Sequence, residues 1–198
     1  GQIITKALLR SDFAQVLILG SRTSQNIASE YPQLEKFLSS YSHLDYVSVD
    51  VSDEHKVNQA VNEWIARTGV PLKGVFHLAS QYHERALKDE SITNFADLSR
   101  TKVLGAMSLS KIVERHAGAF LINFSSTAGI FGGSLIGAYA AAGCVLDALS
   151  QNLRAKGLNC VNISWASWQS TGMSANNTAI DALRTRGILE LNIEAALT

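Results

Sequence analysis

The chain contains the stretch Phe120-Leu121-Ile122-Asn123-Phe124-Ser125-Ser126-Thr127-Ala128-Gly129, in which an apolar run from Phe120 to Phe124 is followed by hydroxyl side chains and a glycine. A segment with helical spacing, Ile136 to Lys156, follows it and carries Tyr139 near its start. The apolar run is typical of a buried strand, and the longer segment is typical of an amphipathic helix. In a doubly wound α/β sheet, Ser126 and Tyr139 would both face the crevice in which such sheets bind ligands.

The same alternation of strand and helix runs through the rest of the chain. Four more short apolar runs predict buried parallel strands: Gln15 to Leu19, Tyr46 to Val49, Gly74 to Leu78 and Cys160 to Trp165. Three more segments have helical spacing: Ile27 to Tyr41, Glu54 to Thr68 and Asp89 to His116. We therefore expect an α/β domain with a Rossmann-like, doubly wound parallel sheet.

Composition argues against several classes of protein. The 198 residues are 46% hydrophobic, which suits one domain with a substantial core. Lys plus Arg equals Asp plus Glu at 17 each, so no net charge attracts nucleic acid. No apolar run approaches the roughly 20 residues that span a bilayer. The two cysteines, Cys144 and Cys160, form neither a disulfide framework nor a metal motif. We expect a cytoplasmic protein that binds no nucleic acid, membrane or metal.

Both ends of the chain depart from a complete doubly wound sheet. Gly1 leads directly into Gln2 to Leu9, a segment with helical periodicity that no strand precedes. The first strand of such a sheet lies centrally, and its backbone pairs on both sides. Ile193 to Leu197 has a helical pattern where one more strand is expected. We expect residues 1–198 to be one domain cut at both ends from a longer polypeptide, without its first strand and glycine-rich loop. The alternative is a compact five-strand variant that folds alone.

Several spaced motifs can be compared with known families. The chain has Lys102-Val103-Leu104-Gly105, then Ser125-Ser126-Thr127-Ala128-Gly129, then Tyr139 followed by Leu146-Asp147-Ala148. In order and spacing they resemble the K-V-x-G, S-S-x-A-G and Y-A-A-A-N…L-D-A patterns of ketoreductase domains from modular polyketide and nonribosomal peptide synthases. These domains belong to the short-chain dehydrogenase superfamily. Two further stretches are similar to that family: Leu72 to Ser80, and Trp165-Ala166-Ser167-Trp168 with Gly172-Met173, which would place a lid over the substrate.

The resemblance implies three catalytic residues. Tyr139 would be the general acid that protonates the substrate carbonyl oxygen as hydride arrives, and Ser126 would hydrogen-bond the same oxygen. A free tyrosine titrates near pKa 10, so Tyr139 needs help to exchange a proton near neutral pH. Lys102 would supply that help, because a nearby ammonium favours the phenolate, and it would also hold the nicotinamide ribose.

The resemblance also implies a cofactor site for NADPH. Gly1 would be the last glycine of the family's fingerprint, at which a helix N-terminus meets the pyrophosphate. Ser21 and Arg22 match the family's S-R, in which the arginine meets the adenosine 2′-phosphate; a planar guanidinium suits that group. The remaining expected contacts are Asp50 and Val51 at the adenine and Ala79 and Ser80 over the ribose. His77 lies within its strand and is expected to be a core histidine.

One position departs from the family. The fourth residue after Tyr139 is Gly143, where synthase ketoreductases carry asparagine. Free-standing short-chain dehydrogenases carry lysine there, so the upstream Lys102 favours the synthase-embedded group. In the wider superfamily the asparagine holds a water in the proton relay. A catalytically silent structural domain is therefore an alternative to an active reductase.

The substrate follows from the resemblance alone. It would be a β-ketoacyl thioester on the phosphopantetheine arm of an acyl carrier protein, with neighbouring synthase domains as further partners. Tyr82, His83 and Glu84 replace the family's L-D-D mark, and Phe131 replaces its tryptophan mark, so the hand of the product alcohol stays open. The segment Tyr82 to Leu87 is similar to domains from mixed synthetases, some of which reduce an α-ketoacyl group on a peptidyl carrier protein. That substrate is the second alternative.

Overall fold

A computed structural model describes residues 1–11, 15–169, 185, 187 and 189–197 of the protein. Five strands lie among them: β1 (Val16–Gly20), β2 (Leu44–Ser48), β3 (Gly74–His77), β4 (Phe120–Ser126) and β5 (Asn159–Trp165). Every pairing between these strands is parallel. The five predicted parallel strands are therefore confirmed, and each end lies within two residues of the expected one.

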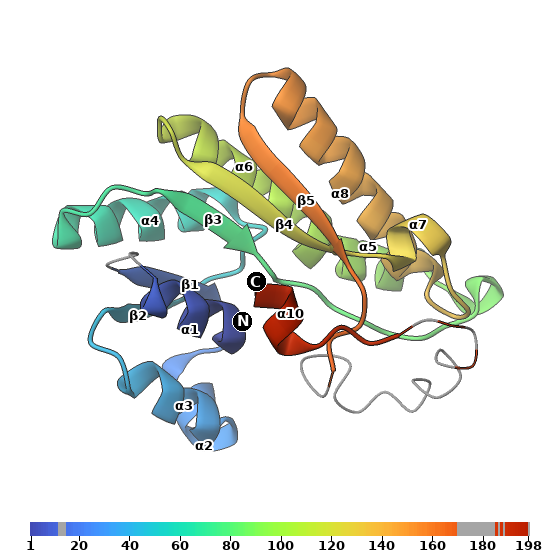
Figure 1. Ribbon diagram of the computed structural model, residues 1–198, viewed down its shortest axis with the longest axis horizontal. Helices are drawn as coiled ribbons and strands as arrows, with labels where there is room; N and C mark the ends of the chain where they lie inside the picture. Colours follow the sequence, from blue (N-terminus) through green and yellow to red (C-terminus); the bar gives the residue numbers. More distant parts are fainter. Residues whose placement is uncertain (12–14, 170–184, 186, 188, 198) are drawn as a thin grey trace.

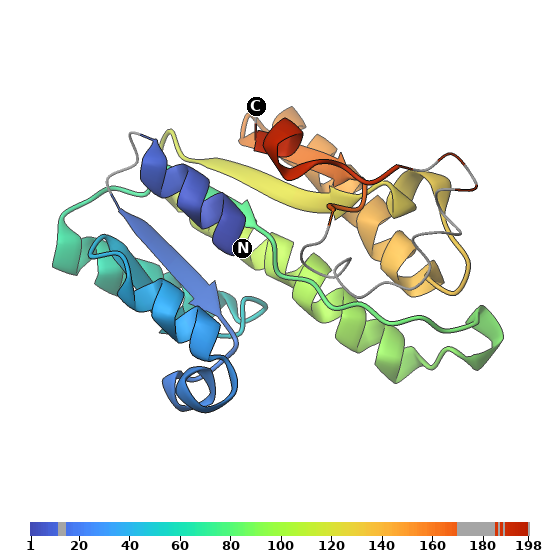
Figure 2. The same ribbon diagram turned by 60° about the horizontal axis from the view of Figure 1, so that its bottom comes forward.

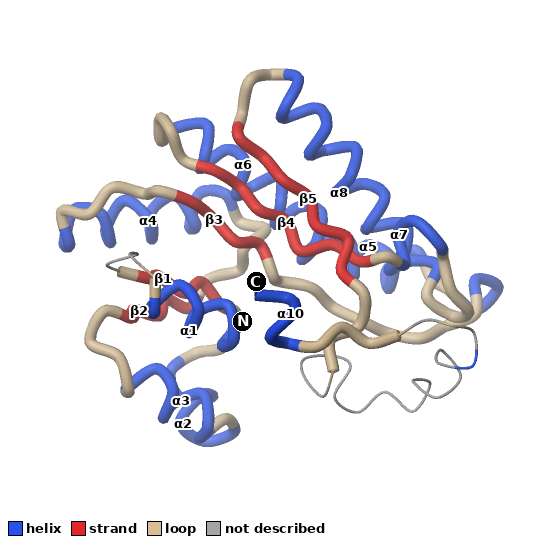
Figure 3. Tube along the Cα trace, viewed as in Figure 1, coloured by secondary structure: helices blue, strands red, loops and turns tan. Residues whose placement is uncertain are grey.

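The strands divide into two sheets, β1-β2 and β3-β4-β5. The two groups are separated between β1 and β3, where none of the described residues forms a connecting strand (Figure 3). This is the position at which a doubly wound sheet places its first strand. The structure thus confirms an α/β fold without that strand.

Helices cover both sheets. They are α1 (Gln2–Arg10), α2 (Ser24–Glu30), α3 (Pro32–Ser39), α4 (Glu54–Thr68), η1 (Leu87–Asp89), α5 (Ile92–Ser99), η2 (Arg100–Leu104), α6 (Gly105–Arg115), α7 (Ala128–Phe131), α8 (Gly137–Ala155) and α10 (Ile193–Leu197). α1 packs against β1 and α3 against β2, whereas α6 and α8 pack behind the three-stranded sheet (Figure 1). None of the described helices is both long and apolar enough to cross a lipid bilayer.

The predicted helix from Ile27 to Tyr41 is wrong as a single element. It is two helices, α2 and α3, which meet at Tyr31, because Pro32 occupies the first turn of α3. A proline ring has no amide hydrogen and collides with the preceding helical turn, so it starts a helix well and continues one poorly.

The predicted helix from Asp89 to His116 is also more complex than expected. A 3-10 turn, η1, comes first, and α5 then begins after Ser91, whose hydroxyl accepts a hydrogen bond of 3.1 Å from the Asn94 amide. α5 and α6 form one long helical run beneath β4 (Figure 2). The wider π-helical turn η2 joins them. Such turns in α-helices are frequently found at functional sites.

The main core lies between α4, α6 and the strands. Val57, Ile112 and Leu121 are its most fully buried members, from α4, α6 and β4 respectively. A smaller cluster joins Leu98 of α5 to Ala138, Tyr139 and Ala142 of α8. This second cluster fixes the start of α8 against α5, and with it the position of the tyrosine singled out above.

Candidate active site

Lys102 lies in the middle of the η2 turn and is completely buried, with 0% of its surface exposed. Its ammonium nitrogen lies 4.0 Å from the centre of the Tyr139 ring. The nitrogen has no hydrogen-bond partner among the described residues. Burial lowers the pKa of Lys102 from 10.5 to about 8, and the negative charge of Asp147 opposes part of that fall. The structure thus brings together two of the three predicted catalytic residues.

Tyr139 lies in the first turn of α8 and is 8% exposed. Burial raises the pKa of its phenol, while the neighbouring hydroxyls of Ser126 and Ser80 lower it. Ser126, at the end of β4, accepts a hydrogen bond of 3.1 Å from the Ala128 amide. The Ser126 hydroxyl therefore lies between the Ala128 amide and the Tyr139 phenol, and it can donate its proton to an oxygen at that position.

His77 is a buried histidine that supports the lysine turn. It is 2% exposed, and its Nε2 lies 2.9 Å from the Lys102 carbonyl oxygen. A carbonyl only accepts, so Nε2 carries the proton and donates it. Burial lowers the pKa of His77, which keeps the ring neutral. The histidine therefore fixes the backbone from which Lys102 projects.

Gly143 lies one turn after Tyr139 and packs directly against another glycine. A Cβ atom at position 143 would lie 3.1 Å from the Gly129 Cα and 3.4 Å from the Ser125 hydroxyl oxygen. Few real Cβ contacts are as short as 3.1 Å, so a side chain at this position requires the Gly129 backbone of α7 to give way by a few tenths of an ångström. The family's asparagine position is therefore occupied here by a close contact between α7 and α8.

A cavity of about 1510 Å³ lies between the two sheets, and its lining runs from the amino ends of the strands, at Gln15 and Lys73, to their carboxyl ends, at Gly20 and Ser80. Its lining includes the whole predicted cofactor set apart from the lysine: Gly1, Ser21, Arg22, Asp50, Val51, Ala79 and Ser80. Lys102, Ser126 and Tyr139 do not line the cavity. Ser80 connects the two groups, because it lines the cavity and also lies beside the Tyr139 hydroxyl.

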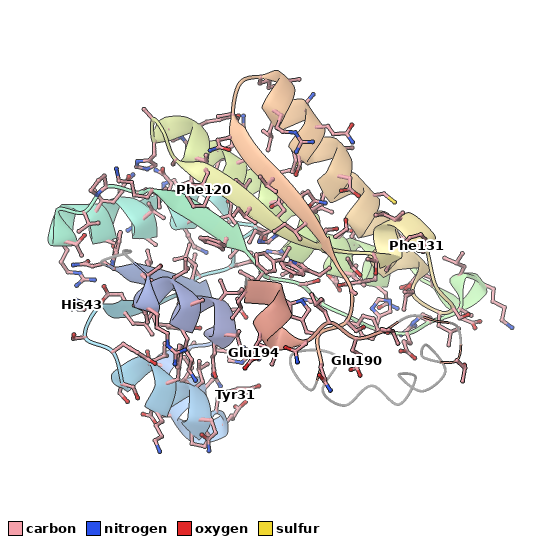
Figure 4. All side chains as sticks on the ribbon, in the orientation of Figure 1. Tyr31, His43, Phe120, Phe131, Glu190 and Glu194 are labelled. Atoms are coloured by element: carbon pink, nitrogen blue, oxygen red, sulfur yellow. The ribbon has the colours of Figure 1, made fainter. Side chains whose placement is uncertain are left out.

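Arg22 is exposed at the end of β1 and stacks on Tyr31, with 4.3 Å between the guanidinium carbon and the ring centre. Figure 4 shows Tyr31 at the α2–α3 corner of the molecule. The Tyr46 hydroxyl donates a hydrogen bond of 2.8 Å to the Arg22 carbonyl. Tyr46 passes over Gly20, where a Cβ would lie only 2.5 Å from its oxygen. The described part of the chain places no carboxylate in an ion pair with Arg22, so its charge is available to an anion.

Asp50 and Val51 have structural partners of their own. The Asp50 carboxylate accepts from the Ser52 amide at 2.9 Å and from Arg100 at 2.9 Å. The Ser52 bonds and the Arg100 charge lower the pKa of Asp50. Val51 is buried, and Gly105 of α6 lies so close that a Cβ there would be 2.9 Å from Val51. Asp50 therefore also links β2 to the turn that carries Lys102.

The sequence alone did not reveal several contacts around Tyr139. Tyr82 packs edge-on against the Tyr139 ring, with 5.4 Å between ring centres. Its hydroxyl donates to Glu84 at 2.7 Å. Trp165 stacks on Phe124 at the end of β4, at 5.4 Å. No short motif signals the two ring pairs, because each joins segments far apart in the chain. The expected lid residues Gly172 and Met173 lie outside the described residues. Among the described residues, no cluster of His, Cys, Asp and Glu could hold a metal ion.

Comparisons with known proteins identify the family of the chain. A family model described as KR domain matches residues 1–170. The chain belongs to the KR domain family. KR domains are ketoreductases of the short-chain dehydrogenase type, whose chemistry uses a nicotinamide cofactor. The predicted family and class of enzyme are therefore confirmed.

The chain spans only part of the length of each relative described below. The chain is 35% identical over 153 residues to Polyketide synthase GfsA of Streptomyces halstedii, covering 76% of this chain and 2% of that protein. The ketoreductase from the first module of phoslactomycin biosynthesis in Streptomyces sp. HK803 is 27% identical, with a TM-score of 0.79 over 93% of this chain and 42% of that one. A short-chain dehydrogenase from Streptomyces avermitilis, 19% identical, shares the fold with a TM-score of 0.74, over 100% of this chain and 76% of that one.

Proposed function

We propose that this KR domain reduces a β-ketoacyl thioester, held on the phosphopantetheine arm of an acyl carrier protein, to the hydroxyacyl thioester with NADPH. One observation carries the proposal: the buried Lys102 ammonium lies 4.0 Å over the Tyr139 ring. A structural domain gains nothing from an unpaired buried ammonium, which is costly to desolvate. In an acid catalyst the same ammonium has a use, because a positive charge beside a phenol favours loss of the phenol proton.

The residues divide the chemistry among themselves. A reduced nicotinamide, when bound, supplies the hydride that adds to the carbonyl carbon. The Tyr139 phenol gives its proton to the carbonyl oxygen, so that the product is an alcohol and the tyrosine is left as phenolate. The Ser126 hydroxyl donates a hydrogen bond to the same oxygen and orients it. The Lys102 ammonium stabilises the phenolate until solvent returns a proton.

The residues present also fit the cofactor. The Lys102 nitrogen is a buried donor without a hydrogen-bond partner among the described residues, as a ribose hydroxyl would require. Gly1 places the start of α1 at the cavity, where helix amides favour a phosphate. Arg22 would hold the 2′-phosphate that distinguishes NADPH from NADH. Asp50, Val51, Ala79 and Ser80 would line the adenosine and ribose positions.

We also propose that the chain is the catalytic part of a longer multidomain synthase. The interrupted sheet supports this, because the facing edges of β1 and β3 would both pair with one further parallel strand. The relatives support it as well, since the chain spans a small part of each synthase that it resembles. Neighbouring domains and an acyl carrier protein would then be its partners.

The test is NADPH consumption by the intact parent protein, with β-ketoacyl and α-ketoacyl thioesters offered in parallel. Turnover of the β-ketoacyl thioester supports the proposal. Turnover of only the α-ketoacyl thioester moves the substrate to the depsipeptide type while keeping the reductase. If a folded parent protein binds no NADPH and turns over neither substrate, the domain is a silent scaffold and the proposal fails.

Replacing Arg22 by alanine tests the choice of NADPH. We expect the KM for NADPH to rise about 10- to 100-fold, because one charge-assisted phosphate contact is lost. The KM for NADH, which lacks that phosphate, should change by less than about twofold. Steady-state kinetics with both cofactors measure the effect, and Arg67→Ala, on the distant end of α4, is the control. Equal losses with both cofactors would show that Arg22 does not read the 2′-phosphate.

Replacing Gly143 by asparagine tests whether the glycine is a packing residue. The new Cβ would press on Gly129 of α7, the helix that directly follows Ser126, and would disturb the position of that hydroxyl, so we expect activity to fall at least about tenfold. Overpacking of this kind should also lower the free energy of unfolding by about 1–3 kcal/mol. Chemical denaturation and NADPH oxidation measure the two effects, with Ala148→Asn on the exposed side of α8 as the control. Higher activity in Gly143→Asn would mean instead that the glycine weakens a proton relay.

A further inference from the structure

The charges around Lys102 include that of one residue, Asp147, to which the family resemblance assigned no role. A buried ammonium keeps its proton only if its surroundings compensate for lost water. His77 of β3 contacts the Lys102 carbonyl, and its ring is neutral. Tyr139 of α8 contributes a ring face. Asp147, also on α8, is the one carboxylate whose charge acts on the lysine among the described residues.

Asp147 lies where it can reach this environment. Positions 139, 143 and 147 are spaced by four and therefore share one face of α8. Tyr139 and Gly143 are buried on that face, and Asp147 is half-buried. Gly143 brings no side chain to the face between them. η2, which carries Lys102, packs against the same helix.

The carboxylate is also fixed from the sheet. The Asn162 side-chain amide, on β5, donates a hydrogen bond to an Asp147 carboxylate oxygen. Asn162 is itself held in the β4–β5 ladder opposite Asn123. This contact therefore fixes the position of the Asp147 carboxylate.

We propose that Asp147 is a positioning residue, whose carboxylate, held by Asn162, favours the charged form of Lys102 beside Tyr139. The inference rests on the proposed reductase function. It adds the charge that maintains the lysine, which is a group distinct from those that meet the substrate or cofactor. Asp147 acts only through Lys102, so its removal should alter the pH dependence of the reaction more than its rate at low pH.

The sign of the effect follows from the charges. Lys102 loses its proton at a pKa of about 8 in the presence of Asp147. Without the negative charge the ammonium is less favoured, so the lysine deprotonates at a lower pH. Activity that depends on the ammonium then declines at a lower pH as well.

The experiment is the pH dependence of β-ketoacyl thioester reduction by the intact parent protein carrying Asp147→Asn. We expect the alkaline limb to move down by about one pH unit. Activity should be about tenfold below wild type at pH 9 and within about twofold at pH 6. Asp147→Glu should restore most of the alkaline activity, because it keeps the charge. The control is Glu114→Gln, which neutralises an exposed carboxylate on α6 that pairs with Lys111.

Each outcome has one meaning. An unchanged alkaline limb in Asp147→Asn, or an equal loss of activity at every pH, overturns the proposal. If Asp147→Asn does not fold, Asn162→Ala is measured in its place, because that variant keeps the Asp147 carboxylate but removes the hydrogen bond that holds it. A smaller shift of the alkaline limb in the same direction supports the proposal. An unchanged pH profile overturns the proposal. Tyr139→Phe is measured alongside. If that variant remains active, the reductase mechanism itself has failed, independently of Asp147.

Discussion

Tyr139→Phe is expected to lower the kcat of ketone reduction by about 1,000-fold or more, because it removes the phenol proton that the proposed mechanism transfers to the developing alkoxide. The phenylalanine ring keeps the contacts with Leu98 and Ala142 in the smaller core cluster. It also keeps a ring face beneath the Lys102 ammonium. The variant should therefore fold and bind NADPH with nearly unchanged affinity.

Stopped-flow or steady-state NADPH oxidation measures this loss, and cofactor fluorescence measures binding. The matched control is Tyr41→Phe, which removes the hydroxyl of a tyrosine that packs against Phe37, far from α8. A Tyr139→Phe protein that binds NADPH and retains more than a tenth of wild-type activity would remove the phenol from the mechanism.

Lys102→Met is expected to lower activity by about 100- to 1,000-fold, because the phenolate left on Tyr139 loses its neighbouring charge. The same change should make the fold more stable. Methionine has a similar length and no charge, whereas the lysine pKa is held down from 10.5 to about 8 by burial. That depression corresponds to roughly 3 kcal/mol of destabilisation in the charged form.

The pH dependence of stability gives this prediction its sign. Between pH 8 and pH 10.5 the unfolded chain binds more protons at Lys102 than the folded chain does. Wild-type stability from this group therefore rises with pH across that window. The gain in free energy of unfolding that Lys102→Met gives over wild type should be complete below pH 8 and should vanish above pH 10.5. Denaturant unfolding at pH 7 and pH 10 measures it. If Lys102→Met is less stable than wild type at pH 7, the buried ammonium has partners that stabilise it.

Much of the fold was predictable from the sequence, because the spacing of apolar residues and the presence of proline or glycine determine secondary structure locally. The alternation of short Val- and Ile-rich runs with helical segments predicted all five strands, and α4 was predicted with its observed ends, Glu54 and Thr68. The break at Pro32 was visible in the sequence, yet the apolar spacing on both sides obscured it. The η2 turn was not predictable, because the wider turn at Lys102 depends on packing against α8 and on the His77 contact with its backbone.

The residues of the candidate site were predictable only where they belong to a sequence motif of the family. Tyr139 and Lys102 are 37 residues apart in the sequence, and their contact was expected from the resemblance alone. The roles of Gly143 and Ser80 required coordinates. A glycine has no side chain to suggest a partner, and the closeness of Ser80 to Tyr139 depends on the path of the segment after β3. These tertiary contacts override any reading of single residues.

The interrupted sheet has a thermodynamic consequence. The dinucleotide site proposed above would be shared between two separately hydrogen-bonded sheets, with Arg22 beside one and Lys102 beside the other. A ligand that reaches across them binds more tightly when the sheets are already held together, and by reciprocity it holds them together when it binds. A strand inserted between β1 and β3 and a bound dinucleotide would therefore act as cooperative effectors of one another. The affinity for the cofactor would then be higher when the further strand is present between β1 and β3 than when it is absent.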